Sequence, residues 1–114
     1  MNPVIFAYIL LGIAIVSEVI GTVFLVKSEG FSKLGPTCAV IIFYVVSFYL
    51  LAQVTKTIPI GIAYAIWGGA GIVLTAFFGV LLFRQSLDWA AILGIAMIIG
   101  GVLVINLLSS SVTH

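Results

Sequence analysis

The sequence has 114 residues, of which 64% are hydrophobic and 6% are charged, and its formal net charge is +1. Soluble domains are about 45–50% apolar and ~25% charged, and so short a soluble chain could not hide this much apolar surface. A nucleic-acid-binding protein is also excluded, because it would need a clustered basic patch. The composition indicates a membrane protein.

Four apolar segments follow one another along the chain, and each is long enough to cross a bilayer. A spanning helix needs ~20 mostly apolar residues. The predicted spans are residues 4–26, 37–54, 60–83 and 89–108. Only short segments separate them, and no linker is visible. We therefore expect an all-α membrane protein with four transmembrane helices in a single domain, residues 1–114.

The first span, residues 4–26, carries one ionisable side chain, Glu18, about three residues past its middle. At 1.5 Å per residue, Glu18 lies roughly 4–5 Å from the bilayer centre. A charge there costs about 2.5–3.5 kcal/mol, and ionisable residues kept at such depths are usually functional. Glu18 is therefore predicted to hold a proton and a cation in turn. The alternative is a structural, protonated Glu18 that hydrogen-bonds between helices. A signal peptide is not expected, because no Lys or Arg precedes this span and it exceeds a usual h-region of roughly 7–15 residues.

Small side chains surround Glu18 on its helical face. Ala14, Gly21 and Thr22 lie three or four residues away, where side chains of a helix are neighbours. They leave room beside the carboxylate, so we expect them to line a pocket. Tyr8 lies near the end of the same span. A place in the site and a place in an interfacial aromatic belt are both open for it.

The third span, residues 60–83, places Tyr64 and Trp67 one helical turn apart. Aromatic rings attract cations by about 0.5–2 kcal/mol, so the pair suits a lipophilic cation beside a carboxylate. Helix packing or interfacial anchoring are the alternatives. The same span is rich in glycine around Gly69 and Gly71. These two predict a hinge, although close packing of helices through small residues would leave the same pattern.

The fourth span, residues 89–108, carries Ala90, Gly94 and Gly101 on one face. Small residues let helices approach closely in a membrane, so Gly94 and Gly101 are predicted to form a dimer contact. No pattern in the chain indicates a metal site, a nucleotide loop or a nucleophile. Neither an enzyme nor a cofactor is therefore expected.

The charges between the spans give the chain a weak orientation. Lys27, Lys33 and Arg84 lie on one side of the membrane, whereas Lys56 and the N-terminal amine lie on the other. The positive-inside rule works from this difference, which is small. A chain with so little bias could insert both ways, and two copies could then associate as an antiparallel pair. Four helices also make a thin wall for a transport path, so an oligomer is expected on size as well.

Several sequence motifs are similar to one known family over the whole chain. They are "MNP" at the start, "SEVIGT" around Glu18, "SEGF" at Ser28–Phe31, "IPIGIAYAIWGGAGIVL" at Ile58–Leu74 and "INLLS" at Ile105–Ser109. With these motifs the chain resembles the small multidrug resistance family. The resemblance implies an antiparallel homodimer of four-helix protomers in the bacterial inner membrane, surrounded by lipid, that exchanges protons for toxic lipophilic cations without a nucleotide.

The resemblance also assigns roles to individual residues. It implies that Glu18 is the shared proton and substrate site. Positions that match the substrate pocket or the span-four contact of the family are Tyr64, Trp67, Tyr8, Tyr44, Phe48, Gly94 and Gly101. The "EVIGT" after the carboxylate resembles the drug-exporting branch, since the guanidinium-exporting branch more often has Trp and Ala there. An exporter of guanidinium or polyamines with the same fold, and a non-transporting membrane scaffold subunit, are the two alternatives.

Two positions depart from the family pattern. The Lys that ends span one in the family would fall at position 26, where this chain has Val26 and Lys27 follows. The loop pattern "GQR" is replaced by "RQS", which moves the Arg to position 84 and puts Ser86 in its place. Both changes keep a cation near the same interface, so we expect them to alter loop contacts or orientation more than chemistry.

Overall fold

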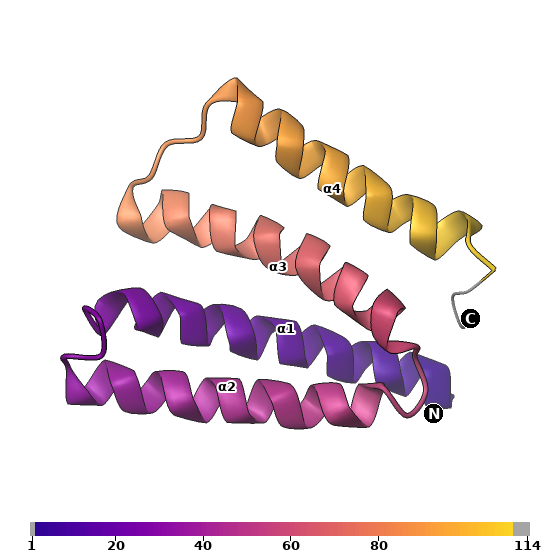
Figure 1. The fold of residues 1–114 in the computed structure, drawn as a ribbon, viewed down its shortest axis with the longest axis horizontal. Coiled ribbons are helices and arrows are strands. Elements are labelled where there is room, and N and C mark those ends of the chain that lie inside the picture. Colours follow the sequence, from indigo (N-terminus) through magenta and orange to yellow (C-terminus); the bar gives the residue numbers. More distant parts are fainter. Residues whose placement is uncertain (1, 111–114) are drawn as a thin grey trace.

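A computed structural model describes residues 2–110 of the chain. Its helices are α1 (Pro3–Lys27), α2 (Leu34–Val54), α3 (Ile60–Phe83) and α4 (Trp89–Leu108). Each is long and apolar enough to cross a membrane. The described chain is therefore all-helical with four span-length apolar helices, as the sequence predicted. Figure 1 shows α1 and α2 as an antiparallel pair, with α3 beside α1 and α4 outermost.

Local sequence explains where the helices begin. The Asn2 side chain accepts a hydrogen bond from the Val4 N–H (2.8 Å), and the Asp88 side chain accepts one from the Ala91 N–H (2.9 Å). Such caps satisfy N–H groups that a helix leaves without partners. α2 begins at Leu34, three residues before the span predicted from sequence. Pro36 is tolerated there because the first turn of a helix does not need its N–H.

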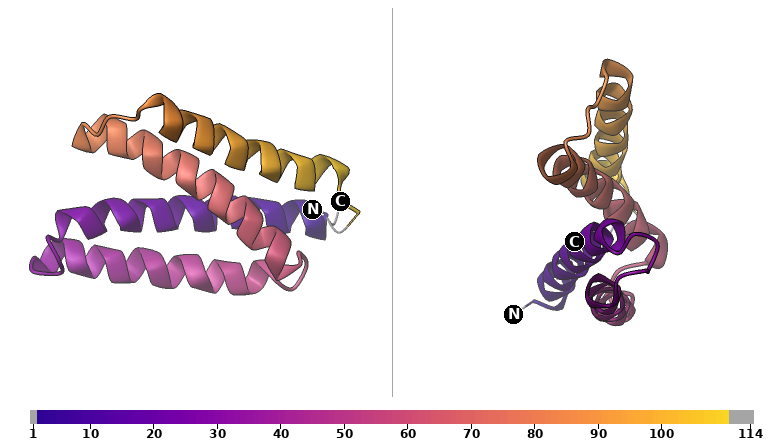
Figure 2. Two further views of the ribbon diagram at one scale, coloured as in Figure 1. Left: turned by 45° about the horizontal axis from the view of Figure 1, so that its top comes forward. Right: turned by 90° about the vertical axis from the view of Figure 1, so that its left-hand side faces the viewer.

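The buried core of the protomer lies where α1 meets α2 and the first half of α3. Its most enclosed side chains include Leu11 and Val19 of α1, Val54 at the end of α2, and Ile58 in the turn that leads to α3. α4 contributes no buried residue. In the end-on view of Figure 2, α4 stands apart from the α1–α2 pair, with α3 between them.

The end of α3 shapes the segment that follows it. The chain reverses at Arg84, which has a left-handed backbone (φ 55°). The Gln85 N–H then donates to the Gly79 carbonyl (3.1 Å). A hydrogen bond of this kind satisfies one of the last carbonyls of a helix. It also directs residues 84–88 back toward the side of the molecule on which Glu18 lies.

Candidate functional site

Glu18 lies in a cavity of about 490 Å³ between α1, α3 and the α3–α4 segment. This volume is within the range of about 300–1,000 Å³ that is usual for small-molecule pockets. The lining residues come from α1, α3 and the segment 84–88: Glu18, Thr22, Trp67, Gly68, Gly71, Ile72, Thr75, Ala76, Gln85 and Leu87. The structure thus brings together three residues that the sequence selected for the site or its lining, Glu18, Thr22 and Trp67.

Thr22 connects Glu18 to α2 through hydrogen bonds. Its hydroxyl donates to the Glu18 carbonyl (3.0 Å), and it lies 3.5 Å from the carboxylate Oε1. It also hydrogen-bonds the Tyr44 hydroxyl at 2.8 Å. A threonine hydroxyl has one proton and two acceptor lone pairs, so it can accept from Tyr44 while it donates toward Glu18. Tyr44 of α2 is therefore linked to the Glu18 carboxylate through the Thr22 hydroxyl.

Three aromatic rings stack in a row at one side of this cavity. The Trp67 ring is 6.1 Å from the Tyr64 ring and 6.2 Å from the Phe48 ring, centroid to centroid, and both pairs are near parallel. Trp67 is only 8% exposed and lines the cavity, whereas Tyr64 and Phe48 are each 52% exposed. Tyr64 and Phe48 do not line the cavity. Each stacks on Trp67, and about half of each side chain is exposed.

No Lys or Arg lines the Glu18 cavity in the part of the chain that the structure describes. The nearest ion pair along the chain, Lys33 with Glu29 (3.5 Å), lies on the exposed turn after α1. A buried charge is costly unless it is paired. Among residues 2–110, no Lys or Arg lines the cavity to pair with the partly buried Glu18 carboxylate.

Ala14 and Gly21 pack against α2 rather than line this cavity. Ala14 is fully buried, and its carbonyl accepts a hydrogen bond from the Ser47 hydroxyl (2.7 Å). A side chain on Gly21 would put its Cβ 2.7 Å from two ring carbons of Tyr44. Gly21 thus lets the Tyr44 ring reach Thr22. Tyr8 is partly buried and packs against the protomer core.

The four glycines selected from sequence lie in different surroundings. α3 is a continuous helix through Gly69 and Gly71. Gly71 lines the cavity, whereas a Cβ on Gly69 would overlap the Val102 side chain of α4. Gly69 therefore permits close packing of α3 on α4, the alternative that the sequence left open beside a hinge. A Cβ on Gly94 or Gly101 of α4 would meet no atom within 4 Å in the protomer.

Sequence reasoning missed Thr75 and Gln85, which both line the cavity. Thr75 follows Trp67 and Gly71 at intervals of four residues, which places it on the same face of α3. That spacing could have identified it. Gln85 had no such signal, because its position depends on the reversal of the chain at Arg84.

Comparison with known proteins gives one consistent result. Residues 6–98 match the family model described as Small Multidrug Resistance protein. The chain is 54% identical to the Multidrug transporter EmrE of Escherichia coli over 114 residues, which is 100% of both chains. It is 48% identical to the Quaternary ammonium compound-resistance protein QacE of Escherichia coli over 107 residues, 94% of this chain and 97% of that one. It is 44% identical to the corresponding protein QacH of Staphylococcus saprophyticus over 104 residues, 91% and 97% of the two chains.

Proposed function

The chain belongs to the small multidrug resistance family of multi-pass membrane transporters, which are not enzymes, and from this premise we propose that it exports hydrophobic and quaternary ammonium cations in exchange for protons at Glu18. Relatives that carry quaternary ammonium resistance in their names support this substrate class. The observation that supports exchange at Glu18 is the cavity itself, in which no Lys or Arg of residues 2–110 lines the space beside this carboxylate.

The exchange needs only one site that two ligands occupy in turn. A deprotonated Glu18 attracts a lipophilic cation, and the Trp67 ring offers it an aromatic wall. A proton that binds the same carboxylate removes the charge and releases the cation. When the cavity opens to the other side of the membrane between these steps, the proton gradient drives export. The apolar and aromatic lining selects for charge and lipophilicity more than for shape.

The proposal includes a homodimer of two antiparallel protomers. The glycines at positions 94 and 101 leave open space on α4, and small residues allow close helix contacts in a membrane. The loop charges give too little bias to impose one orientation. An antiparallel pair would present the same cavity to both sides of the membrane, as alternating access requires.

Labelling from either side of the membrane tests this topology. Ser32→Cys and Thr55→Cys, each made in a Cys38→Ser background, place single thiols in exposed turns at opposite ends of α2. Neither change alters the charges of the loops. With both orientations present, an impermeant maleimide added from one side labels about half of each variant. Complete labelling of one variant and none of the other would contradict the antiparallel dimer.

Transport in sealed vesicles tests the proposed function itself. In proteoliposomes with an acidic interior, the wild-type protein should accumulate tetraphenylphosphonium, and Glu18→Gln should not. Accumulation of guanidinium without tetraphenylphosphonium would favour the guanidinium exporter. The absence of transport of either cation, with a cellular phenotype that Glu18→Gln leaves intact, would favour a scaffold subunit. The aromatic row around Trp67 supports the drug exporter over both.

A further inference from the structure

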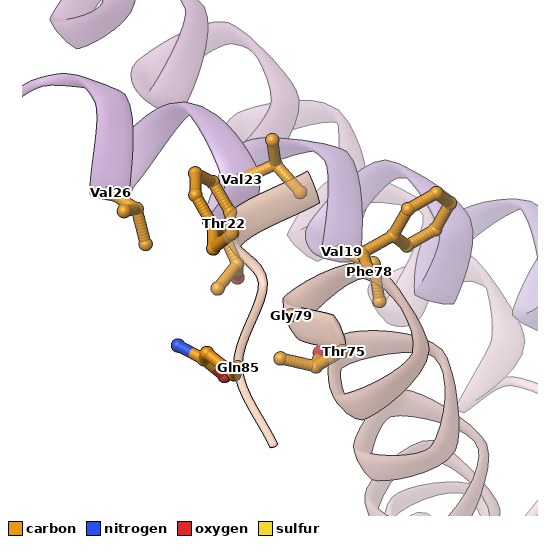
Figure 3. A pocket seen from close by; sticks show the side chains of 9 residues that line it. Val19, Thr22, Val23, Val26, Thr75, Phe78, Gly79 and Gln85 are labelled. Carbon is orange, nitrogen blue, oxygen red and sulfur yellow. The ribbon is translucent and has the colours of Figure 1, made fainter. Parts of the chain in front are cut away.

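A second and smaller recess adjoins the Glu18 cavity near the end of α3. It has a volume of about 60 Å³ and is enclosed mainly by apolar side chains of α1 and α3. Figure 3 shows it between α1, the last turns of α3 and Gln85. Thr22, Thr75 and Gln85 line both the recess and the Glu18 cavity. The boundary between the two spaces is therefore polar.

These three polar residues differ in how they are occupied. Thr22 is engaged by Glu18 and Tyr44. The Thr75 hydroxyl and the Gln85 amide make no hydrogen bond to residues 2–110 and keep their donors and acceptors available. Threonine offers one donor and two acceptor sites, and the glutamine amide offers two donors and a carbonyl oxygen. Together they can both donate a hydrogen bond to a ligand hydroxyl group and accept one from it.

The end of α3 holds Gln85 in this position. Its N–H donates to the Gly79 carbonyl (3.1 Å), and its Oε1 lies over the Cα of Gly79, where a Cβ would come within 2.5 Å. Gly79 thus leaves the space that the Gln85 amide occupies. The position of the Gln85 amide therefore depends on Gly79 before the left-handed Arg84 and on the Gln85 backbone after it.

From this arrangement we infer that Thr75 and Gln85 form a hydrogen-bonding subsite that selects cations carrying a hydroxyl group, so that the protein prefers hydroxylated lipophilic cations over their alkyl counterparts. The inference rests on the proposed function, because it places the cationic centre of the same substrate at Glu18. Thr75 and Gln85 are both exposed in the protomer, so the expected preference is the modest gain of about one hydrogen bond that the substrate hydroxyl makes and the alkyl analogue cannot make.

A matched pair of probes isolates this effect. Propyltriphenylphosphonium and (3-hydroxypropyl)triphenylphosphonium have the same cationic centre and differ by one hydroxyl group. The measurement is the ratio of their dissociation constants for the detergent-purified protein. We expect Thr75→Val or Gln85→Leu to shift this ratio about 2- to 12-fold against the hydroxylated probe, the change that one hydrogen bond produces. Thr55→Val, at the far end of α2, should keep the wild-type ratio.

Gly79→Ala gives a second test without removing a polar group. The new Cβ would displace the Gln85 amide from the boundary of the two spaces, so the ratio should shift in the same direction as in Gln85→Leu. An unchanged ratio in Thr75→Val, Gln85→Leu and Gly79→Ala overturns the inference. A loss of affinity that is equal for the two probes also overturns it, because it would mark a general wall of the cavity. The proposed function fails separately, when Glu18→Gln still binds both probes as tightly as wild type.

Discussion

The α1–α2 pair and the α3–α4 pair are held together in different ways. Side-chain hydrogen bonds cross between α1 and α2, from Ser17 to the Phe43 carbonyl (2.9 Å), from Ser47 to the Ala14 carbonyl (2.7 Å), and between Thr22 and Tyr44 (2.8 Å). Between α3 and α4 the residues described, 2–110, form no side-chain hydrogen bond. α4 buries none of its residues, and its close contact with α3 is at Gly69 and Val102.

This difference follows from the physics of helices in lipid. Apolar surface alone does not drive helices together in a bilayer, because lipid tails are as apolar as the side chains. Hydrogen bonds and close contacts through small residues hold membrane helices together, and the α1–α2 pair has both. The carboxylate at position 18 is therefore placed by contacts within one protomer. The α4 helix has contacts left to make, which suits the dimer that we propose.

Disrupting the contact between α1 and α2 should have the largest effect on stability. Gly21→Val would drive its side chain into the Tyr44 ring, and we expect a loss of about 2–3 kcal/mol in unfolding free energy, as for other overpacked sites. Unfolding by sodium dodecyl sulfate in mild detergent, followed by circular dichroism, measures it. Gly12→Val on the same helix, where a Cβ meets nothing within 4 Å, is the control. Equal losses in both variants would mean that the Tyr44 contact is not what Gly21 provides.

The contact between α3 and α4 should be the next most sensitive. Gly69→Ala would place its Cβ against the Val102 side chain, and we expect a loss of about 1–2 kcal/mol. The double variant Gly69→Ala with Val102→Ala should recover most of it if the glycine serves packing, because the clash is then removed. The same unfolding titration applies. If the double variant recovers no stability, the packing role is wrong, and the hinge predicted at Gly69 is favoured instead.

A single hydrogen bond between α1 and α2 should contribute less. Ser47→Ala removes the buried donor to the Ala14 carbonyl, and we expect a loss of about 0.6 kcal/mol and no more than about 1.7 kcal/mol, the average and the maximum for hydrogen bonds between membrane helices. Thr37→Ala is the control, because its hydroxyl bonds to Lys33 within the first turn of its own helix. A similar loss in both variants would argue against an inter-helix role for Ser47.

The smallest expected effect is a gain in stability at the end of α3, in the α3–α4 pair. Arg84 has a left-handed backbone (φ 55°) at the end of α3, a conformation that favours glycine. Arg84→Gly relieves a left-handed backbone that costs roughly 1–2 kcal/mol, but glycine loses about 0.5–1 kcal/mol more conformational entropy on folding. The unfolding free energy should therefore rise by about 0.5 kcal/mol. Ser86→Gly, two residues on, is the control. A loss of stability in Arg84→Gly would show that the guanidinium makes a contact worth more than the strain.

The sequence predicted the four helices because an apolar run of about 20 residues is typical of a transmembrane helix. It selected Glu18 because a lone carboxylate in such a run stands out, and it selected Trp67 from its spacing to Tyr64. It could not place Gln85, whose position depends on a backbone reversal, nor tell that Gly21 makes room for Tyr44. Those features depend on how helices dock, and mean hydropathy does not encode docking.

The departures from the family pattern have unequal structural consequences. Arg84 stands where the family has the glycine of "GQR", and it adopts the backbone that glycine would favour. Val26 is exposed at the end of α1, and Lys27 follows it in the last turn. A cation in the last turn of a helix is favourable for the helix dipole. The shift of that lysine by one residue therefore keeps its electrostatic role.

In the exchange that we propose, a proton and a lipophilic cation compete for Glu18. Tetraphenylphosphonium binding to the purified protein, measured by calorimetry from pH 5 to pH 9, tests this competition most directly. We expect the wild type to bind more tightly as pH rises and to release protons when it binds, because the cation replaces the proton on the carboxylate. Glu18→Gln should lose this binding, whereas Glu29→Gln, on the exposed turn after α1, should behave as the wild type. Binding that changes neither with pH nor in Glu18→Gln would contradict competition at Glu18.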